Sequence, residues 1–119
     1  MNIEFLSNQH KEKYSKLINE LGEVDRNTKV LLYITASGCT INTNDCYSIK
    51  QKELILENIE KYLDFASNGE IILLKLALHF FNPNFYKVDM QIANLLDTLD
   101  TRGNLLLKNS ILIYRELAK

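Results

Sequence analysis

The hydrophobic and polar positions along the chain alternate with the period of amphipathic helices. The most apolar segment is residues 67–82, where Ser67 and Glu70 precede the sequence IILLKLALHFF in a capping-box pattern. In such a box the Ser side chain accepts a backbone N–H, and the Glu side chain reaches back to the Ser N–H. Only Lys75 and His79 interrupt the apolar residues that follow. A helix that is apolar on all sides has to be surrounded, so the pattern predicts a central helix over residues 67–82.

Helix-start and helix-stop residues divide the rest of the chain into further helical segments. Ser7 and Gly22 bracket a first helix, and Asp25 can cap a second one that ends at Gly38. Residues 30–37 are β-prone by propensity, but we predict a helix because no second strand is available to satisfy the backbone.

The remaining segments consist of one polar loop and three apolar stripes. The loop covers residues 39–50, and a helix can begin within it near Thr43 or Asp45. The stripes lie at 55–66, 88–99 and 104–117, with a turn expected at 100–103. The chain therefore predicts an all-α single domain, residues 1–119, of five to seven helices packed around the 67–82 helix.

Composition and charge narrow the class of protein. Of the 119 residues, 46% are hydrophobic and 24% charged, which is typical of a folded domain rather than a disordered chain. No apolar run approaches the ~20 residues that a bilayer requires. The polar N-terminus does not look like a signal peptide, so we expect a cytoplasmic protein. With 14 basic and 15 acidic residues, the net charge of −1 favours neither nucleic acid nor a membrane surface as the partner.

Two cysteines and two histidines are the residues from which a metal site or a nucleophile would be built. Six residues separate Cys39 from Cys46, unlike the short spacing of zinc knuckles, and His10 and His79 lie far away in sequence. The chain has no nucleophile elbow, Gly-rich phosphate loop or H-E-x-x-H stretch. We therefore expect reduced thiols, packed histidines, no cofactor or metal, and no catalytic residues. A cysteine-dependent enzyme ranks third among the functional hypotheses.

Apolar and aromatic side chains outside the predicted core favour a protein-binding function. Phe85 and Tyr86 lie beside the only proline, and Tyr47 lies in the 39–50 loop. The final helical segment, with Ile113 and Tyr114, has more apolar residues than one stripe holds. Aromatic residues are common at binding hot spots, although these residues can also simply complete the core. We predict that these five residues contact another protein or a second copy of the chain, as in a homodimer.

Lysine clusters keep a small regulatory nucleic-acid-binding protein as the alternative hypothesis. The clustered residues are Lys11, Lys13 and Lys16, and then Lys50, Lys52 and Lys61. Glutamates are interspersed among both groups, and the net charge gives little attraction to phosphate. Nucleic acid is therefore the less favoured partner.

Several stretches together resemble a family of small uncharacterised proteins, recorded as a domain of unknown function. The matching stretches are Phe5, Leu6 and His10; Asp25, Arg26 and 31–34; 67–82; and 96–100. Members of that family come from low-GC Gram-positive bacteria and their phages or other mobile elements. The resemblance implies an accessory gene, for example in phage–host conflict, and it brings no catalytic residues to this chain.

Overall fold

Four helices begin at a side chain that caps them, in the computed structural model, which describes residues 2–116. Ser7 accepts the His10 N–H at the start of α1 (Asn8–Leu21), and Asp25 accepts the Thr28 N–H at the start of α2 (Arg26–Thr35). Ser67 forms the full capping box at the start of α5 (Asn68–Phe81), and Asp100 caps α7 (Thr101–Tyr114). Such caps satisfy backbone N–H groups that have no partner within the helix.

The other elements are shorter. Helix α3 (Thr43–Cys46) leads into a hairpin of β1 (Tyr47–Ser48) and β2 (Glu53–Leu54), in which Tyr47 pairs with Leu54. Helices α4 (Leu56–Phe65) and α6 (Ile92–Thr98) complete the set. The predicted all-α class of five to seven helices is confirmed, with seven helices among residues 2–116, whereas the hairpin was not expected. None of the helices in the described part of the chain is long and apolar enough to span a membrane.

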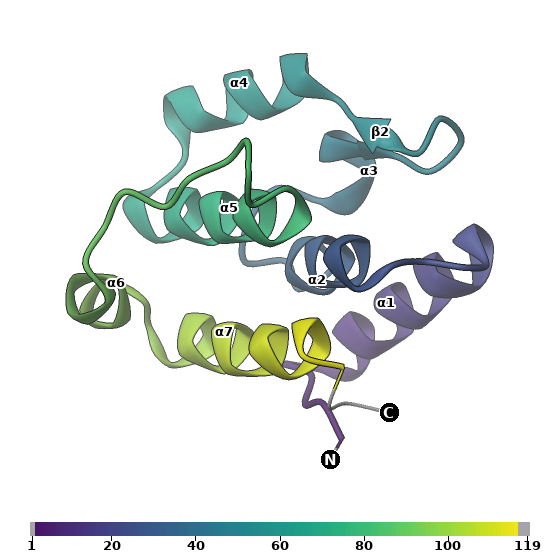
Figure 1. Ribbon diagram of the computed structural model, residues 1–119, viewed down its shortest axis with the longest axis horizontal. Coiled ribbons are helices and arrows are strands. Elements are labelled where there is room, and N and C mark those ends of the chain that lie inside the picture. Colours follow the sequence, from purple (N-terminus) through teal and green to yellow (C-terminus); the bar gives the residue numbers. More distant parts are fainter. Residues whose placement is uncertain (1, 117–119) are drawn as a thin grey trace.

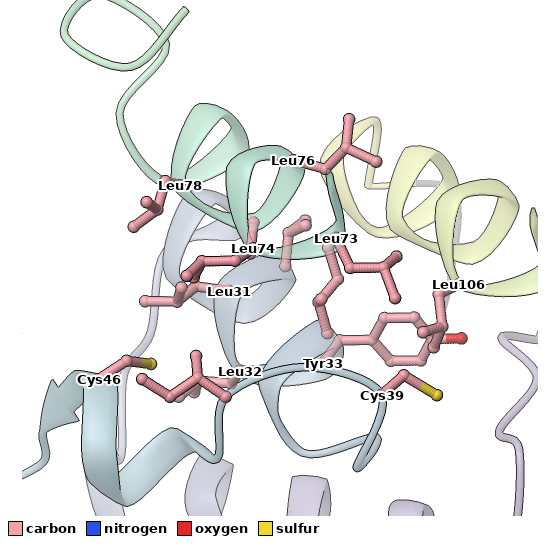
Figure 2. Packing of buried hydrophobic residues seen from close by; sticks show 14 of the residues in the cluster. Leu31, Leu32, Tyr33, Cys39, Cys46, Leu73, Leu74, Leu76, Leu78 and Leu106 are labelled. Carbon is pink, nitrogen blue, oxygen red and sulfur yellow. The ribbon is translucent and has the colours of Figure 1, made fainter. Parts of the chain in front are cut away.

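Helix α2 is the most enclosed element of the fold. It packs against α1, α5 and α7, and Figure 1 shows α5 and α7 on either side of it. Six consecutive residues, Val30–Thr35, are buried, as are five residues of α5, Leu73, Leu74 and Leu76–Leu78. Figure 2 shows Leu31 of α2 beside Leu74 of α5 in this core, and Leu32 on the side of Cys46. The helix over residues 67–82 is therefore part of the core, but α2 occupies its centre.

The all-round apolar character of α5 has a different cause from the one expected. Its inner face packs on α2, while the connection from α5 to α6 runs back across it (Figure 1). His79 Nδ1 lies 2.7 Å from the Tyr86 carbonyl oxygen, and Val88 packs against the core cluster. The irregular segment between α5 and α6 therefore covers part of the outer face of α5, next to α6.

Three boundaries differ from those expected. Helix α2 ends at Thr35 rather than at Gly38, and α6 covers seven residues of the 88–99 stripe. Residues 100–103 are the first turn of α7 and not a separate turn, because Asp100 caps the helix there. A Cβ at Gly103 would lie 3.0 Å from Leu99 Cδ2, so the missing side chain permits this close approach. Leu117, expected in the last helix, lies outside the described residues.

Candidate interaction surface

A shallow groove of about 400 Å³ runs along the outer face of α5. Its floor comes from Ile71, Ile72 and Lys75, which lie on one side of the helix at the spacing of one turn. Residues 87–90 form one wall, and Leu95 and Thr98 of α6 line the other side. Three separate parts of the chain therefore build the groove, and most of its lining is apolar.

Helix α6 carries an apolar stripe that the protein covers only in part. Leu95 is 6% exposed and Leu99, at the end of the helix, is also buried, whereas Ile92 is 77% and Leu96 43% exposed. Positions 92, 95, 96 and 99 fall on one stripe of a helix, so the buried and exposed residues are neighbours. Met90, which lines the groove, is exposed as well. We call the groove together with Met90, Ile92 and Leu96 the α6 surface.

Two opposite charges line the groove from different parts of the chain. Lys75 projects from α5 and Asp89 from the 87–90 segment, and both residues are exposed. Within residues 2–116 neither has an ion-pair partner. The Lys87 ammonium, by contrast, donates to the Pro83 carbonyl oxygen at 3.1 Å, within its own loop. Among residues 2–116, the groove therefore presents two ammonium groups and one carboxylate without an ion-pair partner, and only Lys87 of the three is held within its own loop.

Of the five residues predicted to bind a partner, Phe85 is the one that projects into solvent. Its ring is exposed and rests edge-on against Tyr86, with 4.9 Å between the ring centroids. Tyr86 is partly buried and packs against the core. Tyr114 is also partly buried, because the Arg26 guanidinium lies 4.4 Å from its ring centroid and Phe80 packs beside it.

Tyr47 and Ile113 are core residues and do not belong to a surface. The β-hairpin turns the Tyr47 ring towards Phe81, at a centroid distance of 6.0 Å, and α7 directs Ile113 into the core with Leu106. The final helix is thus less exposed than its composition suggests. Ile111 is the one large hydrophobic residue of α7 that is strongly exposed. Exposed large apolar side chains are therefore more numerous on α6, with Ile92 and Leu96, than on the final helix.

Sequence reasoning did not select Met90, Ile92 or Leu96. The sequence predicts only an apolar stripe over 88–99, and such a stripe does not show which of its residues stay exposed. The signal that could have revealed them is the position of the stripe. It follows a helix that is apolar all round and precedes an apolar final helix, so the core has more apolar faces than it can cover. Met90 carries no such signal.

The cysteines and histidines singled out in the sequence are buried or hydrogen-bonded within the fold. Cys39 and Cys46 are free and buried, and burial raises the pKa of the Cys46 thiol to about 12. His10 is a buried residue of α1. His79 is a residue of α5, and its Nδ1 lies within hydrogen-bond distance of the Tyr86 carbonyl oxygen. In the described part of the chain, no three His, Cys, Asp or Glu side chains are grouped so that they could hold a metal ion.

Cys46 is expected to resist alkylation in the native protein. A thiol with a pKa near 12 instead of the ordinary 9.0 has about a thousandfold less thiolate at a given pH, and the thiolate is the reactive form. Treatment with iodoacetamide at mildly alkaline pH, followed by peptide mass spectrometry, should label Cys46 rapidly only after denaturation. A Cys39→Ala chain removes the competing thiol, and fast native labelling of that chain would contradict the expectation.

The groove and α6 lie within a region shared with other proteins. The family model of DUF6075, a family of unknown function, matches residues 1–105. The chain belongs to this family. Membership in a family of unknown function, expected from the sequence motifs, is therefore confirmed, and the matched range contains every residue of the α6 surface. Neither the curated proteins nor the solved structures give a match to this DUF6075 chain.

Proposed function

We propose that this DUF6075 protein is a non-enzymatic cytoplasmic protein that acts by binding another protein or a second copy of itself through the α6 surface. The observation that carries the proposal is the partly covered apolar stripe of α6, which leaves Ile92 and Leu96 exposed beside an apolar groove. Clustered apolar residues on the surface of a folded domain commonly mark sites of protein interaction.

The α6 surface combines features that favour binding over simple exposure. Complete burial of a side chain such as Ile92 stabilises a complex by about 1.5–3 kcal/mol relative to leaving it in water. The groove next to it offers a concave apolar surface for a partner side chain, and its rim supplies charged groups. Hydrophobic centres with a polar rim are the usual anatomy of protein interfaces.

The biological setting follows from the sequence resemblance. The motifs resemble proteins from low-GC Gram-positive bacteria and their phages or mobile elements. On that basis we propose an accessory role, in which binding inhibits or modulates a host or phage protein. Such a role requires only a stable binding surface and no catalytic group.

The test is affinity capture from a native lysate with an Ile92→Asp chain and with a Leu96→Asp chain. We expect each change to weaken partner binding by at least about tenfold, because a carboxylate would have to be desolvated in an apolar contact. The matched control is Leu56→Asp, which makes the same kind of change at an exposed leucine of α4, outside the α6 surface.

Nuclease treatment and a salt series accompany the capture experiment. Binding that survives nuclease and changes little with salt is expected for an apolar protein contact, whereas nucleic-acid binding weakens steeply with salt. If folded Ile92→Asp and Leu96→Asp chains retain the same partners as the unmodified chain, the α6 surface is not the binding site.

A further inference from the structure

Resting on the proposed function, we infer that the partner of the α6 surface is the α6 surface of a second copy of this chain, in a two-fold symmetric dimer. A two-fold interface is built from the same surface on both copies, so that each residue meets its complement on the other copy. Such a surface must therefore contain both halves of every contact: a projection and a recess, and a positive and a negative group.

The apolar part of the α6 surface meets this requirement. Ile92 projects from the first position of α6, and the groove opens on the same part of the molecule, lined by Met90 only two residues earlier in the chain. A second copy related by a two-fold axis would present its own Ile92 to this groove and its own groove to this Ile92. Leu96 lies one helical turn from Ile92 and would extend the same contact.

The charges of the groove meet the requirement as well. Lys75 of α5 and Asp89 of the 87–90 segment both line the groove, are exposed, and lack an ion-pair partner among residues 2–116. In a two-fold arrangement Lys75 of each copy can face Asp89 of the other, which gives two equivalent ion pairs across one interface. The neighbouring Lys87 keeps its positive charge, but its ammonium donates to the Pro83 carbonyl oxygen, which holds it within its own loop. Electrostatic complementarity of this kind fixes the register of a complex.

Charge reversal tests the pairing directly. Sedimentation velocity over a wide concentration range should show a monomer–dimer equilibrium for the unmodified chain. In a dimer of Lys75→Glu chains, both contacts would join two negative groups. In a dimer of Asp89→Lys chains, both contacts would join two positive groups. We expect each of these chains alone to dissociate at least about tenfold more readily, because opposed like charges are unfavourable across an interface.

A mixture of the two variant chains separates contact between copies from contact within one copy. In a mixed dimer both pairs regain opposite charges, so an equimolar mixture of the Lys75→Glu and Asp89→Lys chains should dimerise about as well as the unmodified protein. Labelling one chain with a fluorophore at its N-terminus identifies the mixed species. The Leu56→Asp chain is the control and should dimerise normally, since Leu56 lies on α4.

The outcomes distinguish this inference from the proposed function. A monomer at every concentration, or a mixture that does not regain dimerisation, overturns pairing through Lys75 and Asp89. The proposed function is then still decided by the capture experiment with Ile92→Asp and Leu96→Asp. Dimerisation that these two apolar changes leave intact also overturns the inference, because the interface then lies elsewhere on the molecule.

Discussion

A Leu74→Asp protein is expected not to fold. Leu74 is 0% exposed on the face of α5 that packs on α2, so the new carboxylate would be buried without a partner. Replacing a buried leucine by alanine alone costs about 2–5 kcal/mol, and burying an unpaired charge adds several more. A domain of this size has a free energy of unfolding of about 5–15 kcal/mol, which the change would largely consume.

Circular dichroism and chemical denaturation measure this effect. The far-ultraviolet spectrum of the Leu74→Asp chain should lose its helical signal, and no cooperative unfolding transition should be seen. Leu56→Asp is the matched control, since the same substitution falls on a leucine that is 55% exposed at the start of α4. There a negative charge also meets the positive end of the helix dipole. A cooperative Leu74→Asp protein with native-like helicity would contradict this assignment of the core.

Helix starts were the part of the fold that local sequence could predict. Ser7, Asp25 and Ser67 each accept the backbone N–H of the residue three positions on, as expected from their chemistry. The same rule applies at Asp100, where the capping residue was interpreted as part of a turn. A cap is a contact between residues close in sequence, so its signal survives without knowledge of the tertiary structure.

The identity of the central helix depends on contacts that local sequence does not record. Residues 30–37 are β-prone by propensity, yet residues 30–35 lie in a helix at the centre of the fold, because α1, α5 and α7 surround α2. The apolar residues on all sides of α5 suggest instead that α5 is the central helix. Part of this apolar surface is in fact covered by the irregular segment around Tyr86 and Val88. Periodicity reports that a face is covered, but not what covers it.

For the candidate surface, as for the fold, the sequence indicated some residues correctly and others not. The exposure of Phe85 agrees with its place in a loop beside proline, and a protein-binding role remains a prediction. Tyr47 and Ile113 were misplaced because their burial depends on a two-residue hairpin and on the rotation of α7. Ile92 and Leu96 were overlooked because an exposed and a buried apolar stripe have the same sequence pattern.

His10 holds the N-terminal segment in a way that requires the neutral imidazole. Its Nε2 lies 2.7 Å from the Tyr33 carbonyl oxygen, and the Leu6 N–H donates to its Nδ1 at 3.1 Å. A carbonyl only accepts and an N–H only donates, so Nε2 carries the proton and Nδ1 does not. The same segment is held by the Glu4 N–H, which donates to Asn109 Oδ1, and by the Tyr33 hydroxyl, which donates to the Glu4 carbonyl oxygen. Protonation of Nδ1 would break the bond to Leu6.

The protein is therefore expected to lose stability in mild acid through His10. Burial, opposed by the Tyr33 carbonyl and reinforced by the positive charge of Lys13, lowers the pKa of His10 below its ordinary value of 6.5. In the pH window between the folded and unfolded pKa values, the unfolded chain binds more protons than the folded one. The free energy of unfolding thus falls as the pH drops through 6.5, and this contribution levels off below the folded-state pKa.

The loss is measured by guanidinium denaturation of the unmodified and His10→Gln chains from about pH 7.5 to about pH 5.5. One proton gives a slope of at most about 1.4 kcal/mol per pH unit, and the slope attributable to His10 should be absent from the His10→Gln chain. The stability advantage of the unmodified protein over that chain should consequently shrink as the pH falls. Nitrogen-15 NMR of the ring should show protonated Nε2 and bare Nδ1 at neutral pH. Equal slopes for the two chains, or a ring proton on Nδ1, would show that the imidazole does not hold the N-terminal segment in this way.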